Sequence, residues 1–304
     1  MSVVVGPYES SEVVLVRAVT NLHPGLGRAG DIVDLPVQKD NLGFPVIYAS
    51  SLKGAMKSTL WQNHNKRDII RALFGSDPDD SEKFTSALAV LDAFTVAFPV
   101  RSLEGVYAFV TSPLLLKRFG ELLDLARKDC KNLKWLEELF TDDFRCETSR
   151  DAEKRLIVKE LNKILINEEI EIECLTTHEG HIRKLEKSFG IEEGRLVVLS
   201  DDNALRAIER SLVRVTRVAL DRETKRVRRG ALWTEEYVPR GTIFATLFLY
   251  SKPRGHNLNM SAEDVKKELH DLLEGRNYLI IGGDETVGRG IVKLIFWKGW
   301  EWWV

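Results

Sequence analysis

The chain has 304 residues, of which 44% are hydrophobic and 30% charged, and its formal net charge at pH 7 is -2. This length and composition indicate a globular protein with a substantial apolar core. The nearly neutral charge argues against a non-specific binder of polyanions, because such binding rests on neutralising phosphates with Lys and Arg.

Targeting and cysteine signals are weak. No apolar stretch is long enough to span a bilayer, and the apolar segment at residues 3–5 is too short for a signal peptide, so we expect a cytoplasmic protein with no membrane partner. Cys130, Cys146 and Cys174 are odd in number and widely spaced, which matches neither a disulfide framework nor a zinc motif. We therefore expect reduced structural thiols.

The first predicted strand, over residues 12–20, runs into a glycine-rich loop over residues 22–36. Glycines allow backbone N–H groups to converge on an anion, and His23, Asp31 and Asp34 add groups that can move protons or hold a metal. The combination indicates a phosphate backbone beside acid–base chemistry. Asp34 in a turn before Pro36 and His23 hydrogen-bonded within a turn are the structural alternatives.

A helix is predicted over residues 52–62, capped by Ser50 and Ser51, with Lys53 and Lys57 on its polar face. The positive end of its dipole would suit a phosphate. Further along, we expect strands over 88–100 and 105–110 and helices over 113–128 and 133–140.

The segment 151–194 is charged and mixed in periodicity, as expected for an insertion into a compact core. We therefore predict one domain over residues 1–304, with insertions at about 63–86 and 113–200.

A basic hairpin is predicted next, from strands over 211–220 and 225–237 around the turn at 221–224, within a projecting segment 206–240. Basic residues far outnumber acids between 206 and 229. They are Arg206, Arg210, Arg214, Arg217, Arg222, Lys225, Arg226, Arg228 and Arg229. A solvated charged face is the alternative to an RNA-binding arm, and Glu235, Glu236 and Tyr237 at its base would join the site.

The C-terminal part is predicted to contain a strand over 242–250, a helix over 261–274 with capping-box spacing, and strands over 278–281 and 291–297. The last two flank a second glycine loop, residues 282–290. Arg289 among these glycines could fork onto phosphate oxygens, whereas Asp284 and Glu285 oppose an anion. A tight β-turn is the structural alternative.

This order of elements predicts an α+β fold with a ferredoxin-like or RRM-like core that carries large insertions. A doubly wound parallel sheet fits less well, because the strands cluster and do not alternate regularly with helices.

The chain also contains an ordered set of motifs that together are familiar. They are His23-Pro24-Gly25-x-Gly27, Ile32-Val33-Asp34-Leu35-Pro36-Val37-Gln38, Gly43-Phe44-Pro45-Val46-Ile47, Ser50-Ser51-Leu52-Lys53-Gly54, Phe98-Pro99-Val100-Arg101-Ser102 and residues 282–290. Over nearly the full chain they resemble the RAMP superfamily of CRISPR proteins, most closely the repeated backbone subunit of the type III-B (Cmr) effector. Asp31 and the short loop 38–43 depart from the family pattern.

The resemblance implies an RRM-like palm with a projecting thumb, copies of the chain stacked along a CRISPR guide RNA beside other Cmr subunits, and target RNA cut at regular intervals. It implies that Asp34 is required for cleavage dependent on a divalent metal, Mg²⁺ or Mn²⁺, as a general base or as a metal ligand. It also implies that His23, Glu235 and Tyr237 assist cleavage or shape the site. The candidate RNA-binding residues are Ser51, Lys53, Lys57, Arg214, Arg217, Arg228, Gly288, Arg289 and Gly290.

Two other functions stay open. In one, the chain is an RNA-binding scaffold, Asp34 is silent and another subunit cuts the target. In the other, the glycine loops form the nucleotide pocket of a small-molecule enzyme, which the missing P-loop and dinucleotide signatures disfavour.

Overall fold

The computed structural model describes residues 4–27, 33–77, 79–80, 83–126, 146–254, 258–273, 275 and 277–299. The strands are β1 Ser10–Ala18, β2 Val46–Ile47, β3 Leu88–Val90, β4 Ala93–Ser102, β5 Val106–Thr111, β6 Cys146–Thr148, β7 Ile157–Val158, β8 Lys163–Ile166, β9 Ile170–Ile172, β10 Leu196–Leu199, β11 Val213–Leu220, β12 Val227–Tyr237, β13 Ile243–Tyr250, β14 Tyr278–Ile280 and β15 Ile291–Phe296. The helices are α1 Ala49–Asn63, α2 Arg67–Phe74, α3 Pro113–Leu125, α4 Arg150–Leu156, α5 Glu179–Phe189, α6 Asp201–Ser211, α7 Ala262–Leu273 and the short 3₁₀ helix η2 Glu285–Val287.

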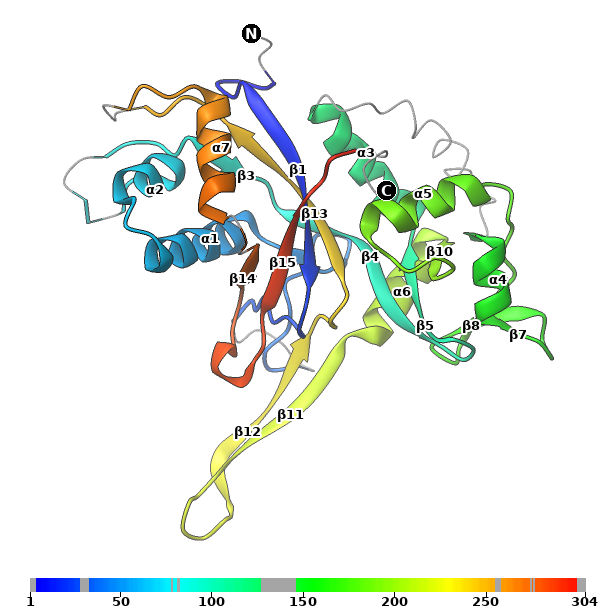
Figure 1. Ribbon diagram of the computed structural model, residues 1–304. Helices are drawn as coiled ribbons and strands as arrows, with labels where there is room; N and C mark the ends of the chain where they lie inside the picture. The colour runs from blue at the N-terminus through cyan, green and yellow to red at the C-terminus, as the bar shows by residue number, and fades with distance from the viewer. Residues whose placement is uncertain are drawn as a thin grey trace.

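One large mixed sheet organises these elements, in the order β14-β15-β1-β13-β4-β5-β10-β6 (Figure 1). β1 lies antiparallel between β13 and β15, and β10 runs parallel to β5. Every residue of β13 is buried, and so is every residue of β1 except Arg17. Both central strands are therefore covered on both faces, which explains the apolar run at residues 13–16 of β1 and the almost wholly apolar sequence of β13.

The two faces of β1 pack into two different cores. Val14 and Val16 join a core that includes apolar residues of α1, α2 and α7. Val13 and Leu15 point the other way and pack with apolar residues of α3 and α5. This layering confirms the predicted α+β class. The helix expected over 133–140 lies outside the described residues.

The basic hairpin is confirmed as a separate two-stranded sheet of β11 and β12, which projects from the body of the molecule (Figure 1). We call it the thumb. Its register runs from Val213 opposite Tyr237 at the base to Leu220 opposite Val227 near the tip. The predicted segment 206–240 also contains the end of α6, so the thumb itself begins after a helix.

The predicted insertions differ in how they join the body. Residues 63–86 contain α2 and the connection to β3. The segment 151–194, which resisted assignment from sequence, forms α4, α5 and three short strands. β10, at the end of the range 113–200, pairs with β5 and β6 within the large sheet, so this range is partly built into the body. Among the described helices, none is long and apolar enough to cross a membrane.

The expectation of reduced thiols is wrong for two of the three cysteines, because Cys146 and Cys174 form a disulfide. Leu175 exchanges backbone hydrogen bonds with β6, donating to Cys146 and accepting from Thr148. This pairing brings the segment after β9 against β6, and the wide sequence spacing of the cysteines gave no sign of it. Cys130 lies outside the described residues.

Candidate active site at the base of the thumb

Three distant segments meet where β12 returns to the body. Leu35 in the first glycine loop bridges Glu235 of β12, and His23 bridges Gly282 in the second glycine loop. Leu22 and Val238 exchange two backbone hydrogen bonds of 2.9 and 2.8 Å. The base of the thumb therefore joins both glycine loops, and it gathers the sequence-predicted catalytic residues into one region.

His23 is held in a fixed orientation. Its Nδ1 lies 2.7 Å from the carbonyl oxygen of Glu236. A carbonyl can only accept, so Nδ1 carries the hydrogen and Nε2 of the neutral ring keeps a lone pair. A Cβ atom at position 25 would stand 2.6 Å from Nε2, so Gly25 is needed for this ring position. The arrangement presents Nε2 as a proton acceptor inside the glycine loop.

Asp34 is exposed at the end of the first glycine loop. Its Oδ2 accepts a hydrogen bond of 2.8 Å from the backbone N–H of Thr234 in β12. Neighbouring backbone bonds of Leu35 with Thr234 and Glu236 fix the chain on either side. Within the described part of the chain, Thr234 is the only donor to this carboxylate. The carboxylate is thus oriented by the thumb and remains accessible to a substrate or a metal. Asp31 lies outside the described residues.

A partly buried polar cluster lies at the same base. Arg217 Nη1 is 3.1 Å from Glu235 Oε2 and 3.3 Å from the Tyr237 hydroxyl. Trp233 Nε1 donates to Glu235 Oε1 at 2.6 Å. The Tyr237 hydroxyl lies against both Glu235 Oε2 and Asp284 Oδ2, the latter at 2.8 Å. One cation and one phenol therefore serve two carboxylates.

The chemistry of this cluster separates Glu235 and Tyr237 from Asp34. Burial, followed by hydrogen bonding to Glu235 and Asp284, raises the pKa of Tyr237 well above its ordinary value. The phenol is therefore protonated at neutral pH and is not a base. Tyr237 is fully buried and Glu235 is 4% exposed. Of the four predicted catalytic residues, Glu235 and Tyr237 thus lie below the surface of the site, whereas Asp34 reaches that surface.

The glycines of the second loop permit a very close approach of backbones. Gly282 has φ +84°, and a Cβ there would stand 2.0 Å from the His23 carbonyl oxygen. Gly290 has φ +83°, and its Cβ would stand 2.4 Å from the Ile281 carbonyl oxygen. Real Cβ atoms do not approach oxygen atoms so closely, and both φ values favour glycine.

We expected the N–H groups of the second glycine loop to converge on an anion, and the structure shows another arrangement. The N–H groups of Gly283, Gly288 and Gly290 donate to carbonyl oxygens of the chain itself at 3.1, 2.9 and 2.9 Å. They are therefore engaged in holding the loop, and they do not converge on an open anion position. The contact of RNA with Gly288 and Gly290 stays a prediction.

Arg289 keeps unused binding capacity. Its guanidinium carbon lies 5.1 Å from the centre of the Tyr237 ring, an arrangement typical of cation–π contact. Its Nε is buried and has no hydrogen-bond partner among the described residues. The Arg289 side chain is partly exposed although its Nε is buried, so an anion at the loop can still approach the guanidinium.

The predicted RNA-binding lysines of α1 already have partners. Lys53 Nζ donates to Ser86 Oγ and to the Leu88 carbonyl oxygen, both at 2.8 Å. Burial, followed by the nearby charge of Lys57, lowers the pKa of Lys53. Lys57 Nζ lies 2.5 Å from Asp77 Oδ1. These contacts tie α1 to the segment before β3, and any RNA contact would compete with them.

The expected cap of α1 is wrong. The helix begins at Ala49, the residue before Ser50, so Ser50 and Ser51 both lie inside its first turn. The cap comes from a distant residue, because Asp92 Oδ1 accepts a hydrogen bond of 2.6 Å from the Ala49 N–H. A carboxylate thus occupies the helix terminus at which we expected a phosphate.

The thumb arginines fall into two groups. Arg214 Nη2 lies 3.1 Å from Glu236 Oε1, and Arg217 pairs with Glu235, so the base of the thumb is internally neutralised. The cations near the tip are exposed, and in the described structure their side chains have no partner. They are Arg222, Lys225, Arg226 and Arg228. The predicted basic surface is therefore concentrated at the tip.

Sequence reasoning missed Trp233 and the contact between Asp284 and Tyr237. Alternate residues of a strand share a face, so Trp233 could have been grouped with Glu235 and Tyr237 from the period of two. Asp284 comes from a distant loop, and no local signal placed it on the Tyr237 hydroxyl.

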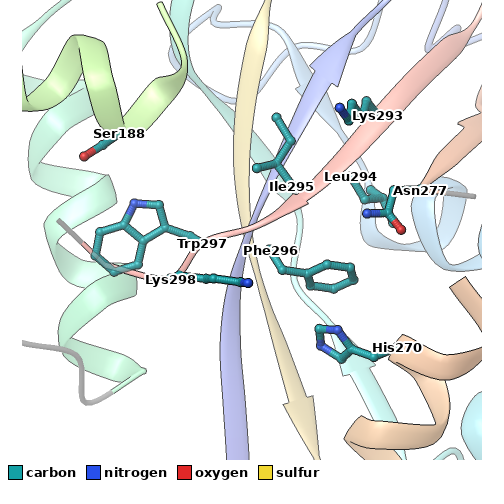
Figure 2. Close-up of a pocket in the computed structure, with 9 residues that line it drawn as sticks. All are labelled: Ser188, His270, Asn277, Lys293, Leu294, Ile295, Phe296, Trp297 and Lys298. Atoms are coloured by element: carbon teal, nitrogen blue, oxygen red, sulfur yellow. The ribbon is translucent and has the colours of Figure 1, made fainter. Parts of the chain in front are cut away.

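A separate cavity of about 450 Å³ lies beside the C-terminal half of β15, between α5 and α7 (Figure 2). His270 there contacts the Phe296 ring, with centroids 4.1 Å apart, and its Nε2 is 2.8 Å from Glu12 Oε2. None of the site residues predicted from sequence lines this cavity. It is distinct from the base of the thumb.

Comparison with known proteins agrees with this architecture. The family described as the RAMP superfamily matches residues 15–293. The chain is 35% identical over 283 residues to the CRISPR system Cmr endoribonuclease Cmr4 of Pyrococcus furiosus, covering 91% of this chain and 92% of that protein.

Two solved structures are also similar. A chain in the cryo-EM structure of type III-B Cmr-beta bound to cognate target RNA is 32% identical, with a TM-score of 0.78 and coverage of 96% of this chain and 98% of that one. The crystal structure of oligomeric Cmr4 from Pyrococcus furiosus is 30% identical, with a TM-score of 0.66 and coverage of 94% and 98%. With identity and coverage at these levels from end to end, the chain belongs to the RAMP superfamily and, within it, to the Cmr4 family.

Proposed function

We propose that this chain is a guide-RNA-binding backbone subunit of a type III-B CRISPR effector and cleaves complementary target RNA with Asp34. The observation that carries the proposal is the Asp34 carboxylate, which is exposed and oriented by the Thr234 N–H at the base of a basic thumb. A relative named an endoribonuclease and a similar chain in a complex with target RNA support it. Copies of this chain and other Cmr subunits are the expected partners.

The proposed reaction is attack of a ribose 2′-hydroxyl on the adjacent phosphate of the target strand. The oxygen of the hydroxyl forms the new P–O bond, its proton leaves to a base, and the bond to the 5′-oxygen breaks. We assign Asp34 as the acceptor of that proton, and His23, whose Nε2 keeps a lone pair, as a second acceptor; the exposed Asp34 carboxylate and the Nδ1 contact of His23 support this. The buried Glu235 and Tyr237 fix β12, and thereby the Thr234 N–H that orients Asp34.

A divalent metal is the alternative role for Asp34. Among the residues that the structure describes, no three His, Cys, Asp or Glu side chains are grouped to hold a metal. Mg²⁺ commonly uses one or two carboxylates, waters and substrate phosphates, so a single Asp34 fits a metal completed by RNA. Bound there, Mg²⁺ or Mn²⁺ would stabilise the negative charge that develops on the phosphate.

The test is cleavage of a labelled complementary RNA by the guide-loaded assembly under single turnover, with Mg²⁺ or with EDTA. We expect Asp34→Asn to slow cleavage by roughly two to four orders of magnitude with guide binding unchanged, as for loss of a general base. Asp202→Asn, an exposed aspartate in α6, is the matched control. Unchanged cutting by a fully assembled Asp34→Asn complex would make the chain a scaffold. Equal rates in EDTA would eliminate the metal role. The cytoplasmic location stays a prediction, and fractionation of the source cells would test it.

A further inference from the structure

Asp284 links the second glycine loop to the thumb through both its backbone and its side chain. Its carbonyl oxygen accepts the N–H of Val287 at 3.1 Å and of Arg289 at 3.2 Å, which closes the loop. Its Oδ2 accepts from the Tyr237 hydroxyl at 2.8 Å and lies 3.8 Å from Arg217 Nη1. The residue adopts φ 64° and ψ 28°, a left-handed conformation that aspartate tolerates better than most non-glycine residues.

The hydrogen bonds at Tyr237 are limited by its single proton. The hydroxyl oxygen can accept from Arg217, and its hydrogen can serve Glu235 or Asp284. Glu235 has two other donors, Trp233 and Arg217, on its oxygens. For Asp284, the hydroxyl is the only hydrogen-bond donor to the carboxylate among the described residues. Asp284 and Glu235 therefore compete for the single proton of the Tyr237 hydroxyl.

Tyr237 in turn supports Arg289. The face of its ring lies under the guanidinium, and the Arg289 N–H is held by the Asp284 carbonyl. Asp284 is therefore connected to Arg289 in two ways: directly, through the loop backbone, and indirectly, through the Tyr237 ring. Arg289 Nε has no hydrogen-bond partner in the described structure, so the Tyr237 ring and the loop backbone are the contacts through which Asp284 can affect the guanidinium.

We propose that Asp284 is a positioning residue that holds Arg289 where it binds an RNA phosphate, although the charge of Asp284 by itself repels RNA. This inference rests on the proposed function, because it assumes that Arg289 meets a phosphate. It makes a prediction with a distinctive sign. If Asp284 were only a charge near the RNA, its removal would strengthen binding; as a positioning residue, its loss weakens binding.

The experiment measures binding of an end-labelled, unstructured single-stranded RNA to the full chain over a range of salt concentrations. Asp284→Gly keeps the left-handed backbone accessible and removes the carboxylate, and we expect it to weaken binding about tenfold, as for loss of one hydrogen bond to a charged group. The slope of log affinity against log salt should fall by about 0.7, which corresponds to one lost phosphate contact. Asp284→Asn keeps an oxygen that can accept from Tyr237 and should restore binding.

Glu285→Ala is the matched control, because it removes the same charge from the exposed neighbouring position and should not weaken binding. In an Arg289→Ala background, Asp284→Gly should have no further effect. Tyr237→Phe keeps the ring but removes the hydroxyl, and should reproduce part of the loss.

The outcomes separate this inference from the function on which it rests. No RNA binding by the wild-type chain, or binding indifferent to Arg289→Ala, contradicts the proposed RNA contact. Binding that depends on Arg289 but is unchanged or tighter in Asp284→Gly overturns the role of Asp284 alone. An Asn variant as weak as the Gly variant also overturns it, because the hydrogen bond would then be irrelevant.

Discussion

Alanine at Gly288 and at Gly290 should have different costs, although the two glycines stand in one loop with similar backbones. Gly288 has φ +76°, and no atom lies within 4 Å of its added Cβ; Gly290 has φ +83°, and its Cβ would meet the Ile281 carbonyl oxygen at 2.4 Å. A left-handed alanine costs about 1–2 kcal/mol at either position. Relieving the overlap at Gly290 should add about 1–3 kcal/mol, the usual range for overpacking.

Urea unfolding of the full chain, followed by tryptophan fluorescence, measures both variants against the wild type. The loss of unfolded-state entropy when glycine becomes alanine is common to the pair and cancels in the difference. We expect Gly288→Ala to lower the free energy of unfolding by about 1–2 kcal/mol and Gly290→Ala by about 2–5 kcal/mol. Equal losses in the two variants would refute the argument that close backbone approach is what requires Gly290.

Three further predictions concern stability. The disulfide joins positions 28 residues apart. In the chain-entropy view, Cys174→Ser should therefore lower the free energy of unfolding by roughly 3–4 kcal/mol. A wild-type chain that is equally stable with and without reductant would contradict this prediction. Burial raises the pKa of Glu186 in the folded state. The side chain therefore contributes to stability below its pKa in the unfolded state, about 4.3, and this contribution is lost as pH rises through its pKa in the folded state. The stability of the wild type relative to Glu186→Gln should therefore decrease from about pH 4 to pH 7, and a constant difference would oppose the assignment. Arg217→Met leaves the Glu235 carboxylate buried without its cation and should cost about 3 kcal/mol or less, since Arg217 is 30% exposed; a urea midpoint equal to that of the wild type would argue against the cluster.

Elements with strong local signals could be predicted from the sequence. Helix α7 is an example, because Ser261 Oγ accepts the Asp264 N–H at 3.2 Å and Asp264 Oδ2 accepts the Ser261 N–H at 2.9 Å, as a capping box requires. The thumb is another, since two β-rich segments around a polar turn form a hairpin by local contacts. Both glycine loops also follow strands as expected.

The sequence could not predict contacts between side chains that lie far apart along the chain. The cap of α1 comes from Asp92, the bond partner of Cys146 is Cys174, and the Tyr237 hydroxyl meets Asp284 from another loop. Each contact joins segments that only the folded sheet brings together. The same holds for Lys53, which the sequence placed on the polar face of the helix and to which the fold gives two acceptors from a distant segment.

The pairing of β1 also has a consequence for synthesis of the protein. β1 ends at Ala18, and both its neighbours in the sheet, β13 and β15, lie beyond residue 242. At roughly 5–20 residues per second, a ribosome needs on the order of 10–50 s to make the intervening chain, during which β1 has neither neighbour. The nascent chain therefore carries β1 unpaired for most of translation, and the part of the sheet that contains β1 cannot assemble until β13 and β15 emerge, although β4, β5, β6 and β10 can pair earlier. The protein should accordingly depend on chaperones that shield early strands, and premature termination should yield aggregating fragments with no partly active enzyme among them.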